Sequence, residues 1–276
     1  MNILITGGTG YFGRAFAAWA ESRCEKVVIY SRDEVKQWSI RQVNPSEKLR
    51  FMIGDVRDLP RLTRAMYGID YVVHAAALKR IEVGHYNPDE MVKTNVIGTM
   101  NVIDAAIQNN VSRVVTLSSD KAFSPVSTYG CTKALAEQLT LNANNITGQQ
   151  GPTFAVTRYG NVAGSTGSVI PAWRNQHARG QKVTITDPEC TRFWMSRREA
   201  VDLVWATIMG GVRTRLAIPT LPAFRLGDLA EAMGVESTVV GLPAHEKLHE
   251  SMQEGQSSEF ARRMSVEEIK ERLEEL

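Results

Sequence analysis

Short apolar runs recur along the first half of the chain and are separated by stretches with helical periodicity. Five of these runs are rich in Val, Ile, Leu or aromatic residues and are too short to be helices, so each predicts a buried strand. They cover residues 3–6, 26–30, 50–53, 70–75 and 113–118. Strands that alternate with helices form parallel sheets with right-handed crossovers and helices on both faces. The pattern therefore predicts an α/β fold built on a doubly wound parallel sheet.

The clearest helical pattern runs from Pro88 to Asn109. Asn87 stands where an N-cap is expected, Pro88 at the first helical position, and Glu90 where a capping box places a glutamate. Apolar residues then form one stripe at helical spacing. The members of this stripe are Met91, Val92, Val96, Val102, Ile103, Ala106 and Ile107.

The sequence pattern changes from about Arg158 onward, where Gly, Pro and Ser become frequent and the predicted elements become short and irregular. We expect a first domain over residues 1–157 and a smaller cap over residues 158–276, interleaved with the last strands of the sheet. The chain ends in a capping box that runs from Ser265 to Glu268. Apolar residues follow it at helical spacing, which predicts a docked terminal helix.

The composition is that of an ordinary globular protein, with 43% apolar residues, 22% charged residues and a net charge of +2. This charge is too small to indicate a nucleic-acid partner. No apolar run approaches the roughly 20 residues that cross a bilayer, and no signal-peptide pattern follows Met1. We therefore expect a cytoplasmic protein with no membrane partner. Cys24, Cys131 and Cys190 lack C-x-x-C spacing, which argues against disulfides and a zinc site.

A glycine-rich turn, Gly-Gly-Thr-Gly-Tyr-Phe-Gly at residues 7–13, follows the first strand. Glycine lets backbone N–H groups approach a pyrophosphate, and the next helix directs its positive N-terminal end at that anion. Because the pattern lies between a strand and a helix, it predicts a Rossmann-type dinucleotide site rather than a plain glycine turn. The residues expected to bind there are Gly7, Thr9, Gly10, Tyr11, Phe12 and Gly13.

The end of the second predicted strand decides which dinucleotide binds. NAD enzymes place an acid there to bind the ribose 2′-hydroxyl. Here Tyr30 precedes Ser31 and Arg32, and Lys36 lies one helical turn further on. A guanidinium and a hydroxyl suit a 2′-phosphate, so the sequence favours NADP. In the alternative, Arg32 is a solvated loop charge, Asp33 takes the ribose and the cofactor is NAD.

The next strand ends complete the predicted cofactor site. An aspartate at the end of the third strand can meet the adenine amino group, and small residues at the end of the fourth let the cofactor pass close. One asparagine of the 88–109 helix is added to this set. The residues are Asp55, Val56, Ala75, Ala76, Ala77 and Asn95.

Tyr129 and Lys133 form a Tyr-x-x-x-Lys pattern, and residues four apart share one helix face. The pKa of an ordinary tyrosine is near 10, but a nearby ammonium and an oxidised nicotinamide favour the phenolate. Lys133 also suits the nicotinamide ribose, and Ser119 can share the proton of a reacting hydroxyl. The pattern predicts a catalytic base beside the cofactor; a buried Tyr near a surface Lys is the alternative.

Asp120 and Lys121 directly follow Ser119 at the end of the fifth strand. Ligands of open α/β sheets bind beyond this edge. A simple epimerase or reductase needs only the Ser, Tyr and Lys, whereas elimination of water beside a new ketone needs one more acid and one more base. The pair therefore favours dehydration; two charges on a solvated loop are the alternative.

These motifs resemble the inverting UDP-N-acetylglucosamine 4,6-dehydratases, within the CapD-like polysaccharide-biosynthesis group of the extended short-chain dehydrogenases. They occur in the family's order. The stretches that carry the resemblance are residues 6–13, 30–37, 54–58, 74–102, 117–133, 158–171, 191–196 and 246–250.

The resemblance implies an NADP-dependent mechanism. Tyr129 would take the proton of the sugar 4-hydroxyl while hydride leaves C4, Lys121 would remove the C5 proton, and Asp120 would protonate the departing C6 hydroxyl. Retaining relatives carry Asp-Glu in place of Asp120-Lys121, so the lysine implies inversion at C5. The positions that match the family's nucleotide-sugar site are Lys79, Asn161, Arg192 and Glu246.

The sequence departs from the family's pattern at three places. Ser119 replaces a threonine but keeps the hydroxyl, His85 replaces a glutamate, and residues 242–245 replace a basic residue, Pro and Gly. The chain is also shorter than typical members, which suggests a trimmed cap. The last departure bears on one phosphate contact and on the identity of the sugar.

His245 to His249 spell H-E-x-x-H, but Pro243 places this segment at the start of a helix and no third ligand is evident, so we expect no metal. The alternatives to a dehydratase are a nucleotide-sugar 4-epimerase and a catalytically silent NADP-binding regulator. Apolar surface on the 88–109 and 128–146 helices suggests a homo-oligomer.

Overall fold

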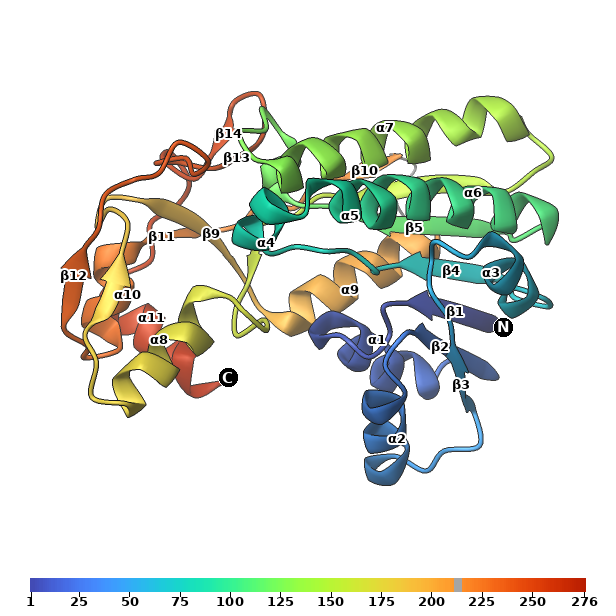
Figure 1. Cartoon of the computed structure of the whole chain (residues 1–276), viewed down its shortest axis with the longest axis horizontal. Coiled ribbons are helices and arrows are strands. Elements are labelled where there is room, and N and C mark those ends of the chain that lie inside the picture. The colour runs from blue at the N-terminus through green and yellow to red at the C-terminus, as the bar shows by residue number, and fades with distance from the viewer. Residues whose placement is uncertain (211–214) are drawn as a thin grey trace.

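The computed structural model describes residues 1–210 and 215–276. A seven-stranded sheet with strand order β10-β6-β5-β4-β1-β2-β3 crosses the middle of the molecule (Figure 1), and each pair of neighbouring strands is parallel. The order runs outward in both directions from β1, as in a doubly wound sheet. The strands are β1 (Asn2–Thr6), β2 (Lys26–Ser31), β3 (Leu49–Ile53), β4 (Tyr71–His74), β5 (Arg113–Leu117), β6 (Thr153–Thr157) and β10 (Leu216–Ala217). The predicted fold class and its five strands are confirmed.

Side chains of β1 alternate between two apolar cores, because successive strand residues point to opposite faces. Ile3 and Ile5 pack in one core with Phe16, whereas Leu4 packs in the other with Val102. Helices therefore cover both faces of the sheet. The helices of this part of the chain, apart from the predicted helix 88–109, are α1 (Tyr11–Glu21), α2 (Glu34–Val43), α3 (Leu59–Ala65), α4 (Ile81–Tyr86), α7 (Thr128–Thr147) and α9 (Arg197–Ile208).

The predicted helix 88–109 contains a π-helical turn. It consists of α5 (Pro88–Val92), the π-helical segment η1 (Lys93–Ile97) and α6 (Gly98–Gln108). The predicted capping box is wrong, because the Asn87 side chain donates to the Val83 carbonyl at the end of α4 instead. The Glu90 carboxylate pairs with Arg57 and Lys93, and both are cations that attract it more strongly than a backbone N–H does.

A smaller layer of three short sheets lies beyond one end of the main sheet (Figure 1) and holds a third apolar core that includes Trp173, Trp194 and Ile269. The chain returns from it to the main body through α9, which packs on α1, and through β10. Its terminal helix begins with the predicted capping box of Ser265 and Glu268. Its elements are β7 (Asn161–Val162), α8 (Val169–Ala178), β8 (Val183–Ile185), β9 (Thr191–Met195), β11 (Ala223–Arg225), α10 (Leu226–Ala232), β12 (Ser237–Val239), β13 (Ser251–Gln253), β14 (Gln256–Ser257) and α11 (Val266–Glu274).

Candidate active site

A cavity of about 610 Å³ opens at the carboxyl ends of the parallel strands and extends to the smaller layer. This is the edge at which open α/β sheets bind ligands, because the strand ends and the helix N-termini converge there. The lining includes residues predicted for cofactor, catalysis and substrate alike. Those of the predicted cofactor set are Gly7, Thr9, Gly10, Tyr11, Phe12, Gly13, Ser31, Arg32, Lys36, Asp55, Val56, Ala75, Ala76, Ala77, Tyr129 and Lys133.

Glycine is required in the turn after β1 by close approach of the backbone. A Cβ on Gly7, whose φ is +67°, would lie 2.8 Å from the backbone N of Ala76, and a Cβ on Gly13 would lie 2.6 Å from the carbonyl O of Gly7. Gly10 is the N-cap of α1 and offers no side chain to its first N–H groups. These donors therefore remain available to an anion, and the turn fits a dinucleotide pyrophosphate.

The two cations expected to select between NADP and NAD, Arg32 and Lys36, each form an ion pair with a carboxylate. A guanidinium nitrogen of Arg32 lies 3.5 Å from Asp55, and Lys36 Nζ lies 2.7 Å from Asp33. The Asp33 carboxylate also caps α2 by accepting from the Lys36 backbone N–H at 2.9 Å. Asp33 thus already has a structural partner, whereas Arg32 is more than half exposed beside the cavity and can turn towards a phosphate.

Asn95 lies apart from the other residues of the predicted cofactor set. Its buried amide accepts a hydrogen bond from the Leu78 backbone N–H at 2.8 Å and donates to the Leu78 carbonyl O at 2.9 Å. It also donates to the Thr132 hydroxyl at 3.0 Å. It is not among the residues that line the cavity. Its side chain fastens the loop after β4 to α7, which carries Tyr129 and Lys133.

The five predicted catalytic residues converge on the cavity from two elements. Ser119, Asp120 and Lys121 lie at and within the short 3₁₀ segment η2 (Asp120–Ala122) that follows β5, and Tyr129 and Lys133 lie in the first turns of α7. Helix α7 begins here because Ser127 caps it, with its hydroxyl accepting from the backbone N–H of Gly130 at 3.1 Å.

Burial dominates the titration of the Tyr129 and Lys133 pair. It raises the pKa of Tyr129 above the ordinary value, although the Lys121 charge and a hydrogen bond with Ser119 act in the opposite direction. It lowers the pKa of Lys133 to about 8, against the opposing charge of Glu137. The expected lowering of the tyrosine pKa is therefore not achieved by the protein alone.

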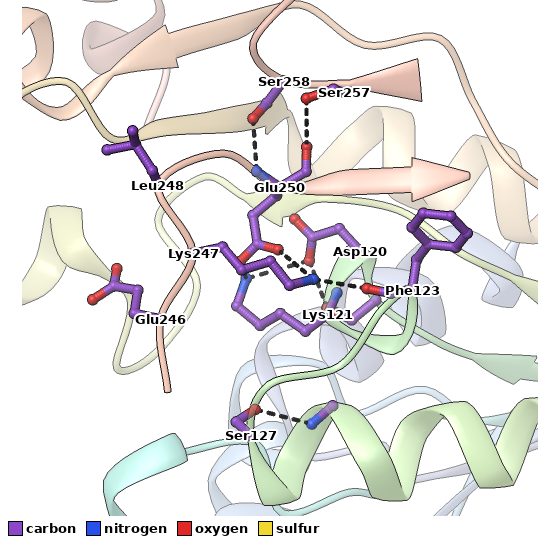
Figure 2. Close-up of polar contacts among 12 residues, drawn as sticks. Asp120, Lys121, Phe123, Ser127, Glu246, Lys247, Leu248, Glu250, Ser257 and Ser258 are labelled. Atoms are coloured by element: carbon purple, nitrogen blue, oxygen red, sulfur yellow. Dashed lines mark hydrogen bonds and ion pairs between the residues drawn. The ribbon is translucent and has the colours of Figure 1, made fainter. Parts of the chain in front are cut away.

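Asp120 and Lys121 are not charges on a solvated loop. Asp120 is 1% exposed, and Lys121 Nζ lies 3.3 Å from its Oδ1. The Lys121 ammonium also lies 3.3 Å from Glu250 Oε1 (Figure 2). Burial alone would lower the pKa of Lys121, but the two carboxylates outweigh it and raise that pKa above the ordinary value.

Glu250 was missed by the sequence reasoning. It lies in the motif of residues 246–250, from which only Glu246 was selected as a site residue. Glu250 is 2% exposed and its carboxylate meets both Lys121 and Lys247. Its position in a matched motif was the available clue, but the distance to Lys121 is set by the tertiary structure alone.

The four predicted substrate residues fall into two groups. Lys79 and Asn161 line the cavity, and Lys79 Nζ lies 3.4 Å from Ser165 Oγ. Arg192 is buried and pairs with Glu246 at 2.5 Å, so these two side chains satisfy one another. Glu246 lines a small adjoining pocket together with Lys121, which places this pair next to the predicted catalytic residues.

Two of the places where the sequence departs from the family's pattern lie side by side. The rings of His85, on α4, and His245 pack edge to face with centroids 4.4 Å apart. The expected helix start at Pro243 is wrong, because residues 244–246 form a turn, and His249 Nδ1 lies 2.8 Å from Thr191 Oγ1. Over residues 1–210 and 215–276 no group of three or more His, Cys, Asp or Glu side chains is arranged to hold a metal. In the same part of the chain no helix is long and apolar enough to cross a bilayer.

An open helix N-terminus behind a glycine turn, joined in one cavity to a Tyr–Lys pair, defines a Rossmann-type protein of the short-chain dehydrogenase/reductase class. Within this class, the family model described as "Polysaccharide biosynthesis protein" matches residues 3–271. The chain belongs to this family.

Individual relatives agree with the family and differ in their named reactions. The chain is 44% identical to a UDP-N-acetylglucosamine 4,6-dehydratase (inverting) of Campylobacter jejuni, over 91% of this chain and 77% of the relative. It is 43% identical to a UDP-glucose 4-epimerase of Rickettsia canadensis, over 84% of this chain and 70% of the relative. The X-ray structure of Pen from Bacillus thuringiensis superimposes with a TM-score of 0.94 at 32% identity, covering 100% of this chain and 97% of Pen.

Proposed function

We propose that the protein is a nucleotide-sugar 4,6-dehydratase that acts on UDP-N-acetylglucosamine and inverts C5. The observation that carries this proposal is the Lys121 ammonium held between two buried carboxylates, in the same cavity as Tyr129. Hydride transfer needs no such group, whereas removal of water next to a ketone needs an acid and a base. The Campylobacter relative bears the name of this reaction.

Tyr129 takes the proton from the sugar 4-hydroxyl, aided by Ser119, and Lys133 holds the ribose of the cofactor. A nicotinamide bound beside these residues would supply the redox chemistry, the removal of hydride from C4 and its return to C6. The new C4 ketone acidifies the C5 proton, which passes to Lys121. Asp120 protonates the C6 hydroxyl, which leaves as water, and Asp120 Oδ2 has no hydrogen-bond partner within the described chain that would compete.

The proposed cofactor is NADP. Ser31, Arg32 and Lys36 line the part of the cavity beyond β2, and Asp33 is occupied in capping α2. A guanidinium and an ammonium beside a hydroxyl bind a 2′-phosphate better than a neutral ribose.

Several apolar side chains are exposed on the helices α5 to α7, and we propose that a second copy of the chain covers them. These are Val92, Ile97, Met100, Leu135 and Ile146.

Incubation of the protein with NADP and UDP-N-acetylglucosamine tests the proposal. The expected product is lighter by one water and, in deuterated solvent, carries deuterium at C5 with inverted configuration. The second candidate is a 4-epimerase, which the Rickettsia relative's name favours. A product of unchanged mass with the opposite configuration at C4 would replace the dehydratase proposal by this one.

A further inference from the structure

Glu250 is a buried carboxylate that the proposed mechanism leaves unused. It lies immediately before β13, and its main chain is fixed by Ser258, whose hydroxyl accepts from the Glu250 N–H at 2.9 Å and whose N–H donates to the Glu250 carbonyl at 2.7 Å. Figure 2 shows its side chain turned from this anchor towards Lys121 and Lys247. A carboxylate is rarely this deeply buried without a charged partner, because loss of hydration is costly.

Glu250 belongs to the segment that joins the smaller layer to the catalytic strand end. Lys247, from the same segment, donates to the carbonyl O of Phe123 at 2.7 Å, directly after η2, and lies 3.5 Å from Glu250 Oε2. The pair thus holds η2 through the main chain at Phe123 and through the side chain of Lys121.

The charges around this point balance. Three carboxylates, Asp120, Glu246 and Glu250, face three cations. The cations are Lys121, Arg192 and Lys247. Removing the charge of Glu250 would leave an excess positive charge next to Lys121, which disfavours an ammonium there.

We propose that Glu250 is a positioning residue that holds Lys121 Nζ at the reacting carbon and stabilises the ammonium formed when Lys121 takes the C5 proton. This inference rests on the proposed dehydratase function. The ion pairs in the structure correspond to the state after elimination, with a proton on Lys121 and none on Asp120 or Glu250.

Lys121 and Asp120 together account for every proton that moves during the elimination. Before elimination one proton moves from Lys121 Nζ to the Asp120 carboxylate, whose Oδ1 lies 3.3 Å away, and this creates the amine base and the carboxylic acid together. The C5–H bond then breaks towards Lys121, its electrons form the C5–C6 double bond, and the C6–O bond breaks as Asp120 returns its proton to the departing hydroxyl. Lys121 is again an ammonium, and Glu250 faces it throughout.

The titration of the two groups agrees with this arrangement. Burial would raise the pKa of Glu250, but Lys121, Arg192 and Lys247 outweigh it and lower that pKa. Glu250 therefore stays charged while the proton moves between Lys121 and Asp120. Because Glu250 helps to raise the pKa of Lys121, its neutralisation lowers the pH at which the pair loses the shared proton.

The test compares Glu250→Gln with Glu254→Gln, an exposed change in the same hairpin. With NADP and UDP-N-acetylglucosamine, we expect Glu250→Gln to lose about 100-fold in kcat, within the usual range for proton-transfer groups, with KM changed less than about threefold. Reduced cofactor should accumulate and raise the absorbance at 340 nm, because C4 oxidation continues while elimination stalls. The alkaline limb of the kcat profile should move to lower pH. Glu254→Gln should match the wild type in all four measurements.

A second variant distinguishes a specific effect of the Glu250 charge from a general loss of folding. Glu250→Asp keeps the charge but shortens the side chain, so we expect an intermediate loss in kcat with the alkaline limb near its wild-type position. The inference is overturned if Glu250→Gln keeps near-normal kcat, or if its loss lies in KM and melting temperature with an unchanged pH profile. Failure of the dehydratase proposal looks different, because the wild-type protein itself then releases no water.

Discussion

The ammonium of Lys121 lies 3.3 Å from the carboxylate of Glu250, although one residue follows a strand of the Rossmann sheet and the other precedes a strand of the smaller layer. Figure 2 shows that this contact and the Lys247 contact to Phe123 lie next to one another. The end of β5, where the proposed catalytic residues lie, is therefore shaped by both layers of the protein. If the proposed mechanism holds, a change in the smaller layer alters proton transfer without touching the cofactor.

Lys121→Ala should stop dehydration while leaving cofactor binding intact. The amine is the proposed acceptor of the C5 proton, and such groups contribute about 10²–10⁴-fold to rate. Mass spectrometry of the product measures the loss of water, and titration with NADP measures binding. Turnover within about tenfold of the wild type would mean that another group removes the C5 proton.

Arg32→Ala should weaken NADP binding by about tenfold and leave NAD binding nearly unchanged, since one charge-assisted contact to a 2′-phosphate is worth about 1.5–3 kcal/mol at most. Arg41→Ala is a matched control, because Arg41 is exposed on α2, the helix that follows Arg32, and does not line the cavity. Calorimetric titration of both variants with both dinucleotides gives the comparison. Equal losses for NADP and NAD would contradict the proposed 2′-phosphate site.

Gly13→Ala should destabilise the protein by about 1–3 kcal/mol and abolish dinucleotide binding, because the new Cβ would lie 2.6 Å from both the Gly7 carbonyl O and the Gly8 Cα. Gly10→Ala is the milder companion, since its Cβ would meet only the Gly7 carbonyl O, at 3.2 Å. Urea unfolding with and without NADP separates the two effects. Normal stability and binding in Gly13→Ala would show that the turn can relax around a methyl group.

His74 should make the protein less stable in acid. Burial, aided by the Lys133 charge, lowers its pKa from 6.5 to about 3, so the unfolded chain takes up a proton in this range and the folded one does not. Stability from this group is therefore complete above pH 6.5 and falls by about 1.4 kcal/mol per pH unit as the pH drops towards 3. Urea unfolding between pH 7 and pH 4 should show a shallower decline in His74→Gln than in the wild type. Identical slopes would contradict a neutral buried imidazole.

Local patterns in the sequence were sufficient for the fold class. The apolar runs define β1 to β5 to within a residue or two, because a strand buried on both faces reads as a continuous apolar segment. The glycine turn, the Tyr129 and Lys133 spacing and the cap at Ser265 also depend on neighbours in the chain, so sequence could identify them.

Only the tertiary structure decided which distant side chains meet. It turned the Asn87 side chain to the Val83 carbonyl at the end of α4 although Asn87 is the N-cap of α5, kept Asn95 out of the cavity lining, and brought Glu250 to Lys121. The physical reason is that buried charges and amides select partners by proximity in three dimensions, and their pKa values follow from those partners and from lost hydration. The sequence by itself determined the chemical groups at the strand ends, and packing between the two layers determined which charged partners those groups meet.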